Sequence, residues 1–225
     1  MTDYKRLTLL CGHYGSGKTN IAVNFAFHLK SKFDNVALAD LDIVNPYFRA
    51  KDSSNELKNA GIRVICSEYA NTNVDIPALP QDMYTLTDDK SLVSVLDIGG
   101  DDRGAYALGR LVPSIIEEKN YDMLMVINKY RPLTPDAESV IEVMREIELA
   151  CRLPFTGIVN NSNLGDLTTA ENILNSVDFA NEVARLSAKP VVMTAVRKDL
   201  AKELEGKIPN LFPMTLQARP FDSAF

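Results

Sequence analysis

The residues of this sequence that are best suited to bind a charged ligand lie near its start. They form the segment Gly12-His13-Tyr14-Gly15-Ser16-Gly17-Lys18-Thr19, which fits the pattern G-x-x-x-x-G-K-[ST] at every fixed position. Glycines let the backbone turn so that successive N–H groups point at phosphate oxygens, and a helix beginning at Lys18 directs its positive dipole end at the same charge. Lys18 is expected to reach the β- and γ-phosphates, and Thr19 to offer its hydroxyl to Mg²⁺. The segment therefore predicts a phosphate-binding loop.

Two other interpretations of these glycines are possible. An ordinary glycine-rich turn is one of them. A dinucleotide-binding turn is the other, but Gly12, Gly15 and Gly17 do not give the spacing G-x-G-x-x-G. The segment follows an apolar run and precedes an amphipathic stretch, which favours the phosphate loop. We expect nucleotide contacts from residues 12–19 and from the adjoining Asn20.

Carboxylates follow two later apolar runs, as a Mg-nucleotide site requires. Asp40-Leu41-Asp42 follows the run at 36–39, and Asp97-Ile98-Gly99-Gly100 follows the run at 92–96. Ligands of an open parallel sheet bind beyond the carboxyl ends of its strands, so both segments are expected to face the phosphate loop. The alternatives are a polar loop for the first segment and a turn that ends a strand for the second.

These acidic segments suggest separate roles in nucleotide chemistry. Asp97, followed by the Gly-Gly pair, resembles a Walker B acid in front of a segment that senses the γ-phosphate, and Gly100 would let the backbone approach that phosphate. Asp42 is the candidate that orients the attacking water, and with Lys18 it makes up the expected catalytic pair. The expected Mg²⁺ ligands are Thr19, Asp40 and Asp97.

The three motifs together resemble the deviant-Walker ATPases of the MinD/ParA type and their relatives in cobyrinate synthesis. That family carries a phosphate loop after its first strand, D-x-D at the end of the second, and D-x-x-G or D-x-P after a later one. The sequence is similar at all three places and in the same order, most specifically over 7–49 and 93–110. The resemblance implies a Mg-ATP-dependent switch that acts on a protein partner or forms a homodimer.

One position departs from the family pattern. His13 stands where the family usually has a second, signature lysine that reaches the nucleotide of a partner subunit. A histidine is mostly neutral near pH 7, so His13 either donates a hydrogen bond or only shapes the loop. Arg49 or Arg103 could supply the missing charge, although an arginine in such a position is more often an ordinary solvated surface residue.

Two segments could recognise the nucleobase. Asn128-Lys129-Tyr130-Arg131 follows the run at 123–127, but Arg131 stands where the guanine-binding pattern N-K-x-D needs a carboxylate. Asn160 follows the run at 156–159, and its position resembles that of the asparagine that contacts adenine in the MinD-like family. The alternative is that Asn160 and Asn161 only shape the turn. ATP is therefore expected rather than GTP.

Short apolar runs alternate with helical periodicity along the chain. The runs lie at 7–11, 36–39, 62–65, 92–96, 123–127, 156–159 and 191–193. They are nearly continuous rather than alternating, as strands are when both faces of a parallel sheet are covered. Helical stripes at 137–150 and 169–187 are expected to direct Leu149 and Leu186 to the core. The pattern predicts one α/β domain over 1–225, a doubly wound, mainly parallel sheet flanked by helices, with loop-rich segments at 67–80 and 209–225.

Composition excludes several classes of protein. The 225 residues include 24 Lys and Arg against 30 Asp and Glu, a net charge of −6, which disfavours a broad electrostatic grip on nucleic acid or anionic lipid. The three cysteines form no C-x-x-C pair, which disfavours a zinc site or a disulfide framework. The first apolar run, at 7–11, is too short for a signal peptide or a membrane span. A cytoplasmic protein is expected, with no membrane or nucleic-acid partner evident.

Three functions fit these motifs. The first is the ATPase switch of the MinD/ParA type. The second is a metabolic enzyme on the same scaffold that uses ATP to phosphorylate or activate a small acid, with substrate contacts from 67–81. The third is a nucleotide-binding regulator with little turnover.

Overall fold

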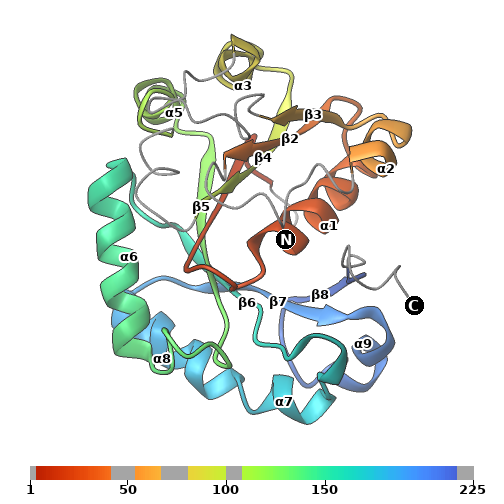
Figure 1. The fold of residues 1–225 in the computed structure, drawn as a ribbon, viewed down its shortest axis with the longest axis vertical. Helices are drawn as coiled ribbons and strands as arrows, with labels where there is room; N and C mark the ends of the chain where they lie inside the picture. The colour runs from red at the N-terminus through yellow and green to blue at the C-terminus, as the bar shows by residue number, and fades with distance from the viewer. Residues whose placement is uncertain (1–3, 42–53, 67–80, 100–107, 217–225) are drawn as a thin grey trace, which may run out of the picture.

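An eight-stranded sheet forms the centre of the protein (Figure 1). The structure, a computed structural model, describes residues 4–41, 54–66, 81–99 and 108–216. The strand order is β3-β2-β4-β1-β5-β6-β7-β8, and all neighbouring strands pair in parallel. The strands are β1 Leu7–Cys11, β2 Val36–Leu41, β3 Arg63–Cys66, β4 Val93–Ile98, β5 Tyr121–Ile127, β6 Gly157–Asn160, β7 Val191–Arg197 and β8 Leu211–Met214. Because every described strand is parallel, the carboxyl ends all meet at one edge of the sheet.

Helices cover both faces of this sheet, with α1 and α2 on one side and α5 and α6 on the other (Figure 1). The helices are α1 Lys18–Lys30, α2 Ser54–Asn59, α3 Thr85–Asp88, α5 Val112–Glu118, α6 Ala137–Cys151, α7 Ala170–Leu174, α8 Val177–Ser187 and α9 Lys198–Leu204. Strand β1 shows why the sequence runs are nearly continuous. Leu9 and Cys11 pack in the core beneath α5, α6 and α8, whereas Leu10 packs beneath α1. The predicted α/β class and the parallel sheet are confirmed.

The last strand corrects the expectation of a loop-rich tail at 209–225. Leu211–Met214 forms β8 at the edge of the sheet, paired with β7 from Thr194↔Leu211 to Arg197↔Met214. Pro213 lies within this strand, and an edge strand tolerates proline because one side of its backbone has no ladder to complete. The expected loop at 67–80 lies outside the described residues.

The single helix expected over 169–187 is also wrong, because the chain forms two helices there. Helix α7 ends at Leu174, and α8 begins at Val177. The hydroxyl of Ser176, which is fully buried, donates to the carbonyl oxygen of Ile173 at 2.7 Å between the two helices. Two residues predicted for the core lie at the surface instead: Leu149 is 80% exposed and Leu186 is 37% exposed.

Within the described parts of the chain, we find no helix with the length and apolar character needed to cross a bilayer.

Candidate nucleotide-binding site

The predicted phosphate loop connects β1 to α1 at the carboxyl edge of the sheet. Gly12 and Gly17 have φ angles of 148° and 90°, a backbone region that residues with a side chain rarely adopt. A Cβ atom on Gly17 would lie 2.3 Å from Nδ2 of Asn161, and one on Gly12 would lie 2.5 Å from the carbonyl oxygen of Val126. Both positions therefore require glycine for the backbone conformation and for the space.

Lys18 begins α1 with its side chain buried against the loop. Its Nζ atom donates to the carbonyl oxygens of Gly12, at 3.0 Å, and His13, at 3.4 Å. The ammonium group is thus folded back over the turn that the glycines make. This places the charge beside the backbone that the sequence predicts to bind phosphate.

The structure brings together the three predicted Mg²⁺ ligands. The hydroxyl of Thr19 donates to Oδ2 of Asp97 at 2.6 Å, and Asp97 is 1% exposed. Asp40 is the register partner of Asp97 on the neighbouring strand β2, and it is also buried. Parallel neighbours in register point to the same face of a sheet, so both carboxylates lie on the side of the loop.

This set of oxygen donors fits Mg²⁺ bound together with a polyphosphate. Mg²⁺ prefers oxygen ligands and is usually held by one or two carboxylates, substrate phosphates and water. Thr19, Asp40 and Asp97 supply one hydroxyl and two carboxylates. In the described ranges no three or more His, Cys, Asp or Glu side chains form a cluster that could hold a metal without the phosphates.

Cys11 lies just before the loop and takes no part in this chemistry. Burial raises the pKa of its thiol far above the ordinary value, and the nearby Lys18 ammonium only partly opposes that shift. The thiol therefore stays protonated, and a thiolate nucleophile is not available at this point of the site.

Asparagine side chains tie the ends of β5 and β6 to the phosphate loop. Asn161 donates from Nδ2 to the carbonyl oxygen of Ser16 at 2.7 Å. Asn128 accepts from the backbone N–H of Asn163 at 3.2 Å and donates to the carbonyl oxygen of the same residue. The buried Asn161 therefore holds the loop against the end of β6, while Asn128 joins the end of β5 to the segment that follows Asn161.

Asn160, the predicted adenine contact, is engaged on both sides of its amide. Nδ2 donates to the Ser176 hydroxyl at 2.9 Å, and Oδ1 accepts from the backbone N–H of Ser162 at 3.2 Å. The residue is 1% exposed. These bonds connect the end of β6 to the break between α7 and α8, and the adenine role stays a prediction.

The remaining loop residues have local contacts. Nδ1 of His13 lies 3.1 Å from the carbonyl oxygen of Tyr14, whose own side chain is exposed. The hydroxyl of Ser16 is buried and has no hydrogen-bond partner among the described residues. Asn20 accepts from Asn24 on α1, and its Nδ2 lies 3.7 Å from the sulfur of Met214.

Four residues named from the sequence lie outside the described residues. They are Asp42, Gly100, Arg49 and Arg103.

One side chain beside the loop was not predicted as part of the site. The guanidinium of Arg131 lies 3.4 to 3.6 Å from the position that a Cβ would take on Gly15. Its neighbours point elsewhere: Lys129 donates to the carbonyl oxygen of Asn175, and the Tyr130 hydroxyl donates to that of Asn172, each at 2.7 Å. The sequence contained a signal for Arg131, since it occupies the last position of the N-K-x-D pattern, a segment expected to lie near the nucleotide.

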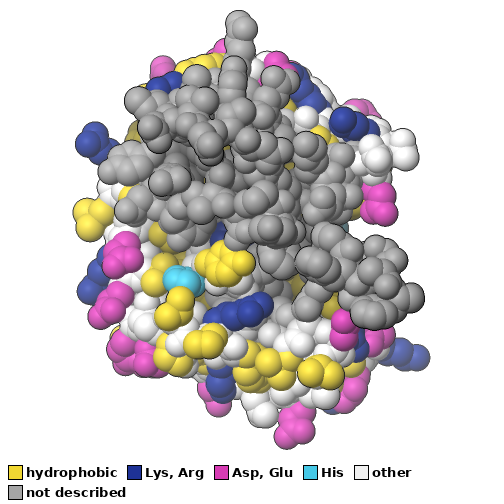
Figure 2. All heavy atoms as spheres, in the orientation of Figure 1, with side chains coloured by type: hydrophobic (Ala, Val, Ile, Leu, Met, Phe, Trp, Pro, Cys, Tyr) yellow, Lys and Arg dark blue, Asp and Glu magenta, His cyan; other side chains and the backbone are white. Residues whose placement is uncertain are grey.

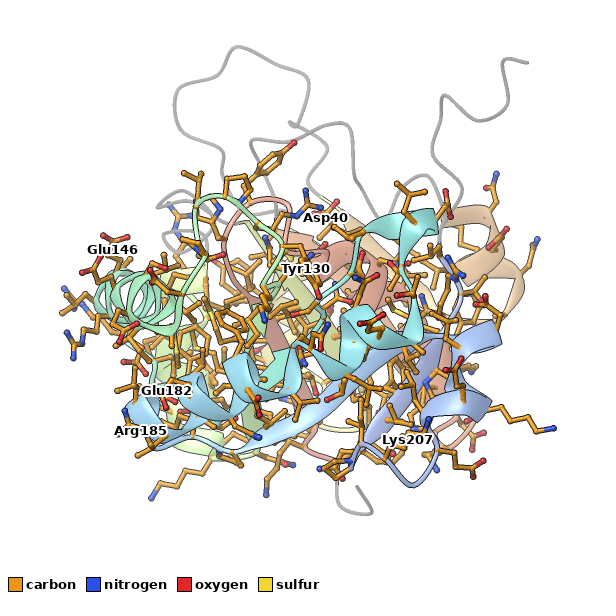
Figure 3. The ribbon with its side chains drawn as sticks, turned by 90° about the horizontal axis from the view of Figure 1, so that it is seen from below. Asp40, Tyr130, Glu146, Glu182, Arg185 and Lys207 are labelled. Atoms are coloured by element: carbon orange, nitrogen blue, oxygen red, sulfur yellow. The ribbon has the colours of Figure 1, made fainter. Side chains whose placement is uncertain are left out.

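The site occupies one side of the molecule. Figure 3 shows Asp40 and Tyr130 toward the same side, with Lys207 and the Glu182–Arg185 ion pair toward the opposite one. Figure 2 shows hydrophobic side chains gathered over α7 and the loop that precedes it. Exposed leucines of this region include Leu164 and Leu167, the latter 81% exposed.

Comparison with known proteins gives matches only at the level of solved structures. No family model matches the sequence, and no curated protein matches it. FtsY from Mycoplasma mycoides is 16% identical over 87% of this chain and 62% of its own, with a TM-score of 0.54. The cell division protein FtsY from Thermotoga maritima is 19% identical over 87% of this chain and 63% of its own, with a TM-score of 0.55. The signal recognition particle 54 kDa protein from Aeropyrum pernix, solved in complex with GDP, is 14% identical over 86% of this chain and 42% of its own, with a TM-score of 0.52.

These likenesses concern the fold. The chain spans less than two thirds of the length of each of these three proteins. The chain therefore has the fold of these FtsY and signal recognition particle structures, a parallel sheet flanked by helices.

Proposed function

We propose that the protein binds Mg-ATP and works as an ATPase switch of the MinD/ParA type. The observation that carries the proposal is the hydrogen bond of 2.6 Å between the Thr19 hydroxyl and Asp97, directly beside a glycine loop that encloses Lys18. A phosphate loop alone binds an anion, whereas a loop joined to a buried strand-end carboxylate is suited to a metal-bound nucleotide.

The residues of the loop and the strand ends would divide the work of binding. Backbone N–H groups of 12–19 and the ammonium of Lys18 would hold the β- and γ-phosphates. Thr19, Asp40 and Asp97 would hold Mg²⁺ against those phosphates. The metal, when bound, neutralises the charge that develops during phosphoryl transfer.

The switch part of the proposal rests on the family resemblance. Asp42 would orient the attacking water, and the backbone at Gly100 would approach the γ-phosphate. Binding of ATP would order the segments around these two residues, and hydrolysis would release them. This conformational change would act on a protein partner or on a second copy of the chain. Tyr14 and Leu167 are exposed hydrophobic side chains of the type that partners cover.

The choice of ATP rests on Arg131. Recognition of guanine through N-K-x-D needs a carboxylate to accept from the base, and Arg131 offers only donors. Guanine nucleotides are the competing possibility, because the Aeropyrum pernix protein and an FtsY from Elizabethkingia anophelis were solved in complex with GDP.

Phosphate release from Mg-ATP and Mg-GTP by the purified protein tests this proposal. We expect ATP to be the better substrate and Lys18→Ala to lower kcat/KM by about 100-fold or more, the effect of removing one group that stabilises transition-state charge. Lys207→Ala is the matched control, because Lys207 is exposed on the opposite side of the molecule.

The metal site provides a second readout in the same assay. Asp97→Asn keeps a hydrogen-bond acceptor for Thr19 but removes the charge, so half-maximal activity is expected to need about tenfold more Mg²⁺ or more. A wild-type protein that neither binds nor hydrolyses either nucleotide would contradict the proposal. Tight binding without turnover would favour the regulator instead.

A further inference from the structure

Arg131 lies on a turn whose backbone is held in place after β5. Its N–H donates to the carbonyl oxygen of Asn128 at 3.1 Å, and its own carbonyl oxygen accepts from the N–H of Thr134 at 3.2 Å. Asn128, which is buried, also accepts from the N–H of Tyr130 at 3.0 Å. The amide network that holds the phosphate loop therefore also fixes the point from which the Arg131 side chain extends.

The side chain of Arg131 extends from this turn onto the phosphate loop. Its Cζ, Nε and Nη1 atoms lie 3.4, 3.5 and 3.6 Å from the position of a Cβ on Gly15. The residue is exposed, and within the described part of the chain its guanidinium makes no hydrogen bond and no ion pair. An unpaired cation thus lies beside the backbone segment that is proposed to bind phosphate.

We infer that Arg131 is a second cation of the nucleotide site and binds the polyphosphate from within the same chain. Lys18 approaches the loop from α1, and Arg131 approaches Gly15 from the turn after β5. The guanidinium presents a planar set of donors that matches phosphate oxygens, and such charge-assisted bonds are the strong ones. Arg131 would thereby supply in cis a second cation beside the phosphates, in a loop where His13 stands at the position of the signature lysine.

A role for Arg131 beneath the nucleobase is the competing explanation. A guanidinium can stack on an aromatic ring, and Arg131 belongs to the segment 128–131 that could recognise the nucleobase. The two roles differ in the ligand they need: a phosphate contact acts on pyrophosphate as well as on a nucleotide, whereas stacking acts only on a ligand with a base.

The inference rests on the proposed function, and calorimetric binding to the full chain tests it with three probes: Mg-ADP, Mg-ATP and Mg-pyrophosphate. We expect Arg131→Ala to raise the Kd of all three by about tenfold or more, the loss expected for one charge-assisted contact. Arg131→Lys is expected to lie between wild type and Arg131→Ala, because lysine keeps the charge and loses the planar fork. Arg145→Ala is the matched control, since Arg145 is exposed on α6.

Each result is decisive. Equal affinities of wild type and Arg131→Ala for pyrophosphate, within about twofold, overturn the inference, and a loss confined to the nucleotides assigns Arg131 to the base instead. A wild-type protein that binds none of the probes overturns the proposed function and this inference with it. Thermal unfolding without ligand is expected to be the same for wild type and Arg131→Ala, because Arg131 makes no described side-chain bond that folding would lose.

Discussion

Gly17 shows how little room the phosphate loop leaves for a side chain. Its φ of 90° disfavours any other residue, and a Cβ would lie 2.3 Å from Nδ2 of Asn161. That amide is bonded to the carbonyl oxygen of Ser16, so it has little freedom to move away. A methyl group at position 17 therefore disturbs both the loop conformation and the hydrogen bond between Asn161 and Ser16.

Gly17→Ala is accordingly expected to lower the free energy of unfolding by about 1 to 3 kcal/mol and to abolish nucleotide binding. Urea unfolding and nucleotide titration measure the two effects. Gly109→Ala is the matched control, because within the described residues no atom beyond its chain neighbours lies within 4 Å of the Cβ it would add. That variant is expected to retain wild-type stability and binding, and a Gly17→Ala protein equal to it would contradict the steric argument.

Single residues also mark how much of the site was predictable. Lys18, Thr19, Asp40 and Asp97 were identified from the motif and from the ends of apolar runs, because phosphate and Mg²⁺ chemistry restricts the residue types that can serve. Arg131 is not among the predicted site residues: its place in the N-K-x-D pattern draws attention to the segment, but an arginine there does not by itself indicate a phosphate contact. Its approach to Gly15 depends on the turn after β5, which sequence spacing does not specify.

At the scale of elements, the loop after β6 and the break between α7 and α8 act as one unit. Asn160 and Ser176 join them through a buried hydrogen bond of 2.9 Å. The periodicity of 169–187 predicts a continuous helix, because the spacing of apolar residues contains no information about this hydrogen bond. Ser176 breaks the helix by donating back to Ile173 and accepting from Asn160, and this pairing requires the folded sheet.

Asn160→Ala separates the structural role of this residue from the predicted adenine contact. It is expected to lower the free energy of unfolding by about 1 to 3 kcal/mol, because it leaves buried partners unsatisfied. Ser176→Ala removes the same hydrogen bond from the other side and is the matched control. If Asn160 contacts adenine, only Asn160→Ala shifts the ratio of ATP to GTP affinity, as nucleotide titration would detect. Equal ratios in both variants would assign Asn160 to the loop alone.

Strand β8 shows that the pattern of apolar residues also fails to predict some strands. Parallel strands buried on both faces are recognisable as apolar runs, and seven such runs were found at the strands from β1 to β7. The edge strand Leu211–Met214 is short and contains Pro213, so its pattern resembles a loop. Its identity comes from pairing with β7 and from the bonds of 2.9 Å between Asn24 and the backbone of Thr215.

At the scale of the whole molecule, an ion pair between a buried arginine and a partly buried glutamate lies at the edge of the sheet opposite to the phosphate loop. Arg6 precedes β1 and is paired with Glu118 at the end of α5. Its Nη1 atom also donates to the carbonyl oxygens of Leu86, Asp89 and Leu92, at 2.9, 3.3 and 3.0 Å. One side chain thus joins the segments before β1 and β4 to the helix before β5.

This ion pair makes stability depend on pH in a defined window. The hydrogen bond from Arg6 is the largest cause that lowers the pKa of Glu118 from 4.5 to about 2; Lys90 adds to it, and burial opposes it. Because the unfolded carboxyl takes up a proton at a higher pH than the folded one, the stabilisation is complete above about pH 4.5. It is lost as the pH falls from there through about 2.

Glu118→Gln is therefore expected to lower the free energy of unfolding at pH 7 by roughly 2 to 4 kcal/mol, since it leaves the buried Arg6 without its charged partner. The difference from wild type should shrink as the pH falls below about 4.5, as urea unfolding across that range would measure. Glu117→Gln is the matched control, because Glu117 is exposed on the same helix turn.

Nucleotide affinity at a temperature where both variants are folded should equal that of wild type, because the ion pair and the phosphate loop lie at opposite ends of β1. A Glu118→Gln protein with wild-type stability, or with weakened nucleotide binding while folded, would contradict this separation.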